Sequence, residues 1–210
     1  MASYGEILNA KRDPNAETES LIHFILIVLA IFAFFLSIFT FVYNGVRVDG
    51  DSMMNTLQDG DYLFMNLIAE PERGDIVVVH TGRKEADYVI KRVIALGGDE
   101  IYAEDGVLYR KCAGETEFSV VEENYLPEPW VYVNEDRPNS FGSKAEPLVI
   151  GENEIFYMGD NRNVSVDCRA ANYGSQPIEN VTGVVTEWSL SIKGFLTSFF
   201  DLFTAAVPES

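Results

Sequence analysis

The chain has 210 residues, which is enough for one domain or for one domain with a membrane anchor. Its formal net charge is −18 at pH 7. Such an acidic chain lacks the cations that neutralise phosphates, so no nucleic acid is expected as a partner, and any attachment to the lipid bilayer must be hydrophobic.

The first predicted element is a transmembrane anchor over residues 21–43, after a polar segment over residues 1–20. The apolar run from Leu21 to Val42 carries no full charge over roughly 22 residues, enough for a helix to cross a ~30 Å hydrocarbon core. A permanent anchor is favoured over a cleaved signal peptide, because the run exceeds an apolar core of about 7–15 residues and no small-x-small site follows it.

Charged residues beside the anchor predict its orientation. Lys11 and Arg12 precede the run, and only Arg47 follows it closely. This bias predicts a cytoplasmic N-terminus and an extracytoplasmic domain over residues 44–192, held in the cell membrane by one span.

After the anchor, short apolar runs with a period of two alternate with turn signals such as Asp59-Gly60. The expected strands are Tyr62–Ile68, Ile76–His80, Tyr88–Leu96, Glu100–Ala103, Val107–Lys111, Glu154–Met158 and Val181–Ile192. This spacing predicts a mainly β domain, an antiparallel β-barrel or sandwich, and no helical stretches alternate with the strands as a parallel α/β fold would need. Residues 112–150 are rich in Glu, Asn and Pro and are expected to form an inserted cap.

The C-terminal tail, residues 193–210, contains a helical pattern. Phe195, Phe199 and Leu202 recur at i, i+4 and i+7, which predicts a short amphipathic helix. Such a helix could lie in a membrane interface or pack on the β domain, and the sequence leaves both open.

Ser52 lies in a glycine-containing bend just after the anchor. Gly50 would allow close approach of a carbonyl group to the backbone, and main-chain N–H groups at such a bend can form an oxyanion site. Met53 and Leu57 would supply apolar walls beside the serine.

Lys91 is a lysine inside an apolar strand. In an alternating strand its side chain shares a face with Val89 and Val93, away from Arg92. A free lysine has a pKa near 10.4 and is a poor base at neutral pH, but burial lowers that pKa. Lys91 could then accept the proton of Ser52; alternatively, on an edge strand, it would extend to water.

The stretch from Gly159 to Arg169 combines Gly with Asp, Asn, Arg and Ser, which indicates a hydrogen-bonded loop. Asp167 and Arg169 could pair, and Ser165 could orient a neighbouring amine. The two cysteines, Cys112 and Cys168, have neither metal-ligand nor redox spacing, and the sequence leaves open whether they pair.

Together these stretches closely resemble bacterial type I signal peptidases, with a Gram-positive-like pattern. The matching stretches, in order, are Gly50–Leu57, Arg73–Val78, Lys91–Asp99 and Gly159–Arg169. The resemblance implies a membrane-anchored serine endopeptidase that removes signal peptides from preproteins after small-x-small sites, without a metal ion or other cofactor.

The resemblance also assigns roles to residues. It implies that Ser52 is the nucleophile, with its own N–H in the oxyanion site near Gly50, and that Lys91 is the general base. It implies that Ser165 hydrogen-bonds the Lys91 amine. The remaining supporting residues are Asp160, Arg92, Asp167 and Arg169, and the expected pocket walls are Val48, Met53, Leu57 and Val89.

The sequence departs from the family pattern at a few positions. Asn55 replaces the usual proline, Val164 a common asparagine and Cys168 a common serine, while Gly50 lacks the hydroxyl donor of some members. None of these changes removes a catalytic group, so activity is expected.

Three other functions are alternatives to a signal peptidase. A self-cleaving repressor-type protease also uses Ser and Lys but lacks an anchor. A Ser–His protease would need His80, which ends a strand and has no evident carboxylate partner in the sequence. A membrane-anchored β domain that binds a partner without catalysis would tolerate loss of Ser52 and Lys91.

Overall fold

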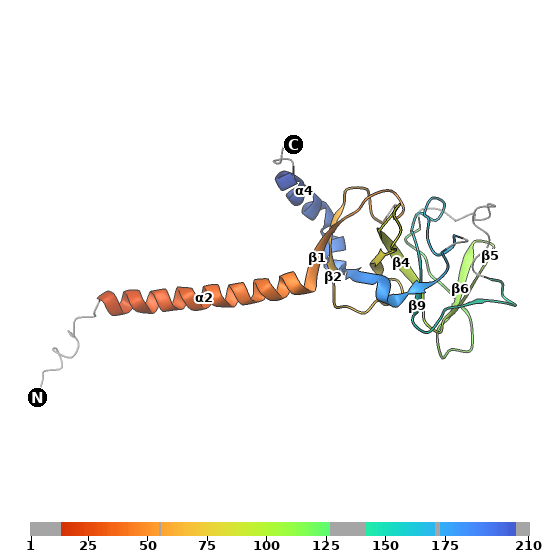
Figure 1. Ribbon diagram of the computed structural model, residues 1–210, viewed down its shortest axis with the longest axis horizontal. Coiled ribbons are helices and arrows are strands. Elements are labelled where there is room, and N and C mark those ends of the chain that lie inside the picture. The colour runs from red at the N-terminus through yellow and green to blue at the C-terminus, as the bar shows by residue number, and fades with distance from the viewer. Residues whose placement is uncertain (1–13, 55, 127–141, 171–172, 205–210) are drawn as a thin grey trace, which may run out of the picture. The chain divides into compact units, whose positions relative to one another are not determined.

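The computed structural model describes residues 14–54, 56–126, 142–170 and 173–204 (Figure 1). The chain forms two compact units, Met1–Val42 and Tyr43–Ser210. The N-terminal unit contains helix α2 (Pro14–Val42), and its stretch Thr18–Val42 is long and apolar enough to cross a membrane.

Polar side chains inside α2 bond to the helix's own backbone. Ser37 Oγ donates to the carbonyl oxygen of Ala33 at 2.8 Å, and Thr40 Oγ1 donates to that of Ser37 at 2.8 Å. Because hydrocarbon offers these hydroxyls no partner, such internal bonds make them compatible with a membrane span.

The second unit is mainly antiparallel β, as the sequence predicts, and contains two sheets. A seven-stranded sheet has the order β1-β2-β11-β3-β4-β9-β10. Its strands are β1 (Tyr43–Arg47), β2 (Tyr62–Asn66), β3 (Ile76–His80), β4 (Tyr88–Leu96), β9 (Glu154–Met158), β10 (Gln176–Pro177) and β11 (Val181–Val185). A 3₁₀ turn, η1 (Ile178–Asn180), joins the last two.

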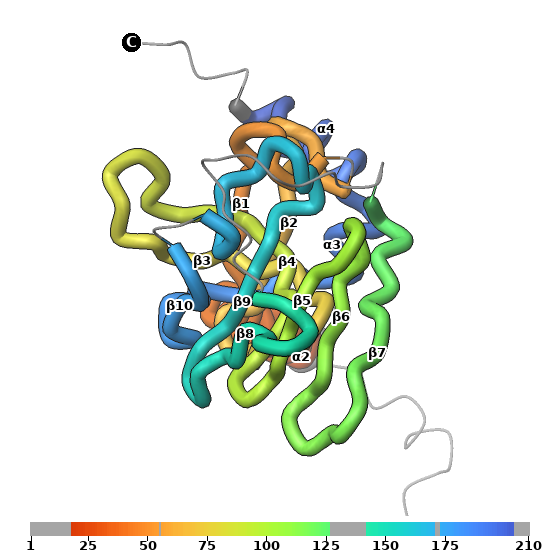
Figure 2. The backbone as a smooth tube through the Cα atoms, turned by 90° about the vertical axis from the view of Figure 1, so that its right-hand side faces the viewer, coloured from red at the N-terminus to blue at the C-terminus, as the bar shows by residue number. Residues whose placement is uncertain are grey.

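A four-stranded sheet has the order β7-β6-β5-β8 (Figure 2). Its strands are β5 (Glu100–Glu104), β6 (Val107–Lys111), β7 (Ser119–Val120) and β8 (Leu148–Val149). The segment 112–150 therefore supplies β7 and β8 to a sheet whose other two strands precede it. Part of the expected cap, residues 127–141, lies outside the described residues.

The β domain has two apolar clusters. The larger joins both sheets and includes Val77, Val93, Ile101, Leu108 and Phe156. The second is built from the loop after β1 together with β2, β3 and β11, and its buried members are Val48, Met53, Leu57, Leu63, Met65, Ile76, Val78 and Val185. The segment around Ser52 is thus anchored in a core of its own.

Strand β1 is a strand that the sequence pattern does not predict. Its Asn44-Gly45 pair is typical of a turn, yet Gly45 pairs with Phe64 of β2. The glycine is needed for close packing, because a Cβ atom there would overlap the Tyr62 ring.

The predicted strand Val181–Ile192 is wrong beyond Val185, where the chain turns into helix α3 (Glu187–Ser191). Thr186 donates from both its N–H and its hydroxyl to the carbonyl oxygen of Phe64, at 2.9 and 3.1 Å, which ends the strand. The predicted tail helix is present as α4 (Lys193–Thr204), which packs on β2.

Candidate active site

Ser52 lies in a tight turn after β1. Met54 N–H donates to the Asp51 carbonyl oxygen, and Gly50 N–H donates to Asp59 Oδ1 at 2.9 Å. Gly50 has φ +85°, while a Cβ atom on it would meet nothing within 4 Å. The backbone conformation therefore requires this glycine, and the expected close approach of a substrate carbonyl to the backbone at Gly50 stays a prediction.

Lys91 lies on β4 opposite Val77 of β3. Its Nζ is 2.7 Å from Ser52 Oγ and 2.9 Å from the Ile90 carbonyl oxygen. Only 3% of Lys91 is exposed, and β4 is an interior strand between β3 and β9. The alternative of an edge-strand lysine reaching water is therefore wrong.

The environment of Lys91 favours a neutral amine. Burial lowers its pKa from 10.5 to about 8, although the charges of Asp167 and Asp160 oppose the shift. An amine with this pKa is partly unprotonated near neutral pH and can accept a proton from the adjacent hydroxyl.

The loop that follows β9 lies against the Ser52 turn. Asn161 donates from its backbone N–H to the Ser52 carbonyl oxygen at 3.0 Å and from Nδ2 to that of Asp51 at 3.0 Å. A Cβ atom on Gly159 would overlap both the Ser52 carbonyl oxygen and Ser165 Oγ. A glycine is thus required for this loop to reach the serine.

Ser165 is brought to the site but does not make the bond that the resemblance implies. Its Oγ is buried and, among the described residues, makes no hydrogen bond to the Lys91 amine. The Lys91 amine instead contacts Ser52 and the Ile90 carbonyl oxygen. The Ser165–Lys91 hydrogen bond is therefore absent from this structure.

Asp167 and Arg169 form a buried ion pair beside the site. Arg169 Nε donates to Asp167 Oδ1 at 2.8 Å, its second nitrogen donates to Oδ2 at 2.9 Å, and Gly159 N–H donates to Oδ2 at 2.9 Å. Burial alone would raise the pKa of Asp167, but these bonds and the guanidinium charge hold it below its usual range. The pair therefore fixes the backbone of the loop at Gly159.

Asp160 links the Lys91 strand to the Ser52 segment. Arg92 donates to both of its carboxylate oxygens, at 2.9 and 2.6 Å, and Thr56 Oγ1 donates to Oδ2 at 2.5 Å. Arg92 also donates to the Gly74 carbonyl oxygen at 2.7 Å. These bonds tie β4, the segment around Ser52 and the loop after β9 into one network.

The expected pocket walls are largely covered. Val48, Met53 and Leu57 are buried in the second apolar cluster, and Leu57 has no exposed surface. Val89 is half-buried on β4, two residues from Lys91, and packs on the larger cluster. A substrate would reach Leu57 only after its neighbours move.

Sequence reasoning missed a second set of polar residues. Arg162 is buried and donates to Glu123 Oε1, to Tyr125 Oη and to the Gly159 carbonyl oxygen. The Tyr125 ring lies under the Arg92 guanidinium, 4.0 Å from its central carbon. Glu123 and Tyr125 lie in an irregular stretch without periodicity, so no sequence pattern indicates them.

Other groups lie outside the Ser52 site. The His80 ring has a carboxylate partner, Asp87, at 3.1 Å. In the sheet, however, His80 lies opposite Tyr88, which is three residues from Lys91 along β4, or about 10 Å away. Cys112 and Cys168 are both free thiols. Among the described residues, no group of three His, Cys, Asp or Glu side chains could hold a metal ion.

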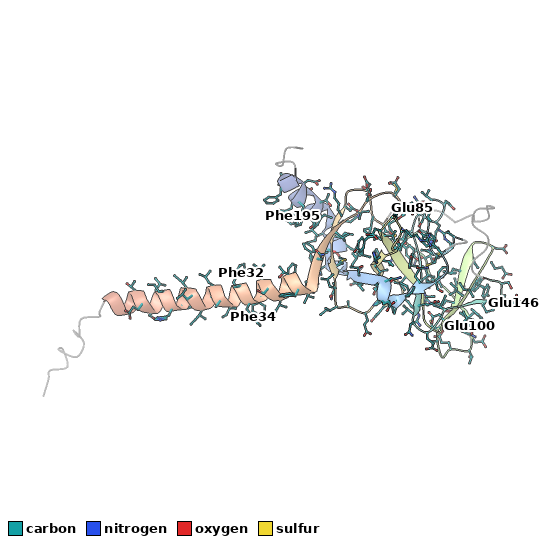
Figure 3. The ribbon with its side chains drawn as sticks, in the orientation of Figure 1. Phe32, Phe34, Glu85, Glu100, Glu146 and Phe195 are labelled. Atoms are coloured by element: carbon teal, nitrogen blue, oxygen red, sulfur yellow. The ribbon has the colours of Figure 1, made fainter. Side chains whose placement is uncertain are left out.

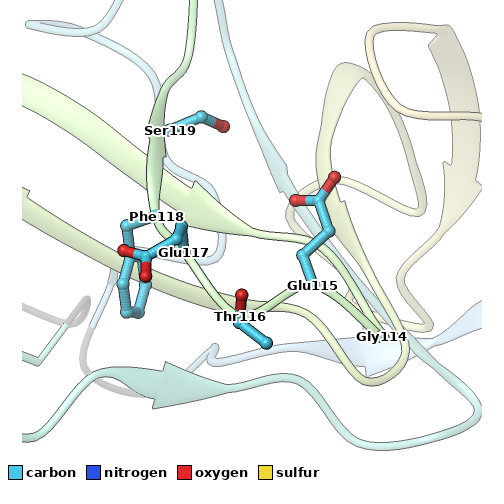
Figure 4. A pocket seen from close by; sticks show the side chains of 6 residues that line it. All are labelled: Gly114, Glu115, Thr116, Glu117, Phe118 and Ser119. Carbon is cyan, nitrogen blue, oxygen red and sulfur yellow. The ribbon is translucent and has the colours of Figure 1, made fainter.

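A surface hollow is formed by residues 114–119, beyond β6 (Figure 4). Glu115 and Glu117 are its charged lining residues. It contains none of the residues around Ser52 and Lys91.

Comparisons with known proteins show which family the chain resembles. A family model described as signal peptidase, peptidase S26, matches residues 21–189. Signal peptidase I of Bacillus licheniformis is 33% identical over 137 residues, which are 61% of this chain and 67% of the relative. Probable signal peptidase I-2 of Synechocystis sp. is 31% identical over 169 residues, 75% of this chain and 69% of the relative. A solved signal peptidase I from Enterococcus faecalis aligns with a TM-score of 0.42 and 28% identity over 57% of this chain and 99% of that one.

Proposed function

The chain belongs to the signal peptidase family, peptidase S26, and from this membership we propose that it removes signal peptides from preproteins with Ser52 as the nucleophile and Lys91 as the general base. The observation that carries the assignment is the 2.7 Å contact between Lys91 Nζ and Ser52 Oγ, made by a lysine residue that is 3% exposed.

The reaction follows from these two groups. Neutral Lys91 takes the Ser52 proton while Oγ attacks the scissile carbonyl carbon, and a tetrahedral oxyanion forms. The ammonium of Lys91 then returns the proton to the departing amine, which leaves an ester on Ser52. A water that gives its proton to Lys91 attacks that ester, and Ser52 regains its proton as the acid product leaves.

We assign the stabilisation of the oxyanion to a main-chain N–H group. Among the described residues, no acceptor takes the Ser52 N–H, so this donor is available to a developing negative charge. Gly50 contributes through its backbone conformation, because its positive φ shapes the turn that presents the donor.

The substrate pocket is assigned to the apolar residues around the serine. Val48, Met53 and Leu57 are buried in the second apolar cluster and Val89 packs on the larger one, and we assign these four residues to the walls that accept the small side chains of small-x-small sites. Their close packing supports exclusion of large side chains, which would displace the core of the nucleophile segment.

The apolar helix α2 and the family membership are consistent with a single-pass membrane protein. We assign its N-terminus to the cytoplasm, because Lys11 and Arg12 precede the span. Residues 44–192, the proposed catalytic domain, then lie outside the cell membrane, where the apolar part of a signal peptide ends. The protein would thus meet its substrates at the lipid surface.

A preprotein cleavage assay in detergent tests the assignment. We expect Ser52→Ala and Lys91→Ala to abolish release of the mature product, and Lys111→Ala, which removes a surface lysine paired with Glu100, to cleave normally. If both site variants cleave at the wild-type rate, the Ser–Lys assignment is wrong, and a non-catalytic role in binding a partner becomes the better account.

A further inference from the structure

Helix α4 has one face that is held by the β domain. Phe200 stacks on Tyr62 with ring centroids 3.9 Å apart, and Thr197 Oγ1 accepts a hydrogen bond from Tyr62 N–H at 2.9 Å. Leu196 is buried on the same side. These contacts fix the rotation of the helix about its axis, and so determine which side chains face away.

The opposite face is apolar and exposed. Phe195, Phe199, Leu202 and Phe203 are all exposed, and Leu202 reaches 73%. The rings of Phe195, Phe199 and Phe203 contact one another in a row, and Figure 3 shows Phe195 projecting away from the strands. A contiguous aromatic surface of this kind indicates a partner.

The charges of α4 are already used within the domain. Lys193 pairs with Asp61 at 2.7 Å, and Asp201 pairs with Arg47 at 3.2 Å. The helix sequence has no other charged residue. The exposed face therefore suits an uncharged apolar partner, rather than an acidic or basic one.

Chain connectivity relates this face to the membrane. Tyr43 begins β1 directly after α2 ends at Val42, so a single peptide link, about 3.8 Å between Cα atoms, joins them. β1 pairs with β2, and the last pair of the register is Arg47 opposite Tyr62. Tyr62 is the residue on which the Phe200 ring stacks. Helix α4 thus packs on β2, whose partner strand β1 directly follows the span along the chain.

We propose that α4 is an interfacial membrane helix whose Phe195, Phe199, Leu202 and Phe203 face enters the lipid. This inference rests on the proposed anchoring by α2. With 12 residues the helix is about 18 Å long, too short to cross a ~30 Å core, so it lies along the surface. The family model ends at residue 189, so α4 is a feature of this chain beyond the matched region.

The test uses the full chain in phosphatidylcholine nanodiscs, because the paired charges of α4 require no anionic headgroup. Nitroxide labels are placed at Phe199→Cys and Leu202→Cys in a Cys112→Ser background, which keeps the fully buried Cys168. Ile31→Cys in α2 reports the anchor, and Val149→Cys on β8, which is 62% exposed, is the matched apolar control.

Each nitroxide is tested for collisions with oxygen, which dissolves in lipid, and with a nickel chelate, which stays in water. We expect the ratio of oxygen to nickel-chelate collisions to be several-fold higher at positions 199 and 202 than at position 149. The proposal is overturned if position 31 reports lipid but the labels at 199 and 202 give the same ratio as position 149. It is also overturned if neither reagent reaches those two labels. An aqueous label at position 31 overturns the anchor, and the inference with it.

Discussion

Gly159 lies so close to Ser165 that a Cβ atom on the glycine would overlap the serine hydroxyl. The same atom would overlap the carbonyl oxygen of Ser52, the residue assigned as nucleophile. The absence of a side chain at Gly159 therefore allows the loop after β9 to support the Ser52 turn.

The first prediction concerns this contact. Gly159→Ala should lower kcat/KM by about 100-fold or more, because a shift of about 1 Å at a reacting group has an effect of that size. Preprotein cleavage kinetics measure the loss, and circular dichroism checks the fold. Gly194→Ala is the control, since a Cβ atom there meets nothing within 4 Å. Normal kinetics for Gly159→Ala would contradict the close packing.

The second prediction concerns pH. Because burial lowers the pKa of Lys91 to about 8, and the base is the neutral amine, kcat/KM should rise as pH increases through about 8 and then level off. Asp167→Asn should move this limb to lower pH, since the Asp167 charge raises the pKa of Lys91. An ascending limb near 10.5 in the wild type would show that the amine is solvated during catalysis.

The third prediction concerns stability. The drop of the Lys91 pKa from 10.5 to about 8 corresponds to about 3 kcal/mol of destabilisation when the amine is charged in both folded and unfolded states. This cost is constant below pH 8, shrinks between pH 8 and 10.5 as the folded state loses its proton first, and is absent above. Lys91→Met should therefore unfold at higher urea than the wild type at pH 7, in detergent.

The same experiment carries its own check. The difference in unfolding free energy between Lys91→Met and the wild type should diminish as pH rises from 8 to 10.5. A difference that stays constant over this range would mean that packing, rather than charge burial, sets it.

The fourth prediction concerns the Glu123–Arg162 pair. Glu123→Gln removes the charge partner of a buried guanidinium and should destabilise the domain by about 3–5 kcal/mol. Tyr125→Phe keeps the ring under Arg92 and should lower the free energy of unfolding by about 1 kcal/mol, the net contribution of a typical hydrogen bond. Urea unfolding measures the loss of stability in the two variants. Equally small losses in both would indicate that Arg162 is solvated.

The fifth prediction concerns the thiols. Cys112 is half-buried, whereas Cys168 is fully buried, and burial raises its pKa. A thiol reagent should therefore titrate one thiol in the native protein and two after unfolding without reductant. Cys112→Ser should abolish the native reaction, and a single thiol in the unfolded wild type would mean that its second cysteine is modified or paired.

The β class and most of the strands could be predicted from local patterns, because alternation and turn residues act over a few neighbours. Strand β1 and the C-terminal end of β11 could not be predicted in this way. Gly45 lies in a strand only because the Tyr62 ring needs the space of a side chain there, and Val181–Val185 ends where Thr186 meets Phe64. Both depend on residues distant in the sequence.

The sequence by itself determined that this chain carries an apolar helix before an antiparallel β domain, and that Ser52 and Lys91 stand in stretches typical of signal peptidases. Only the tertiary structure decided that Lys91 lies on an interior strand, that its amine contacts Ser52 and Ile90 rather than Ser165, and that Glu123 and Tyr125 contact the buried Arg162. The reason is that periodicity reports which face a side chain occupies, whereas burial, pKa and hydrogen bonding depend on which distant segments cover that face.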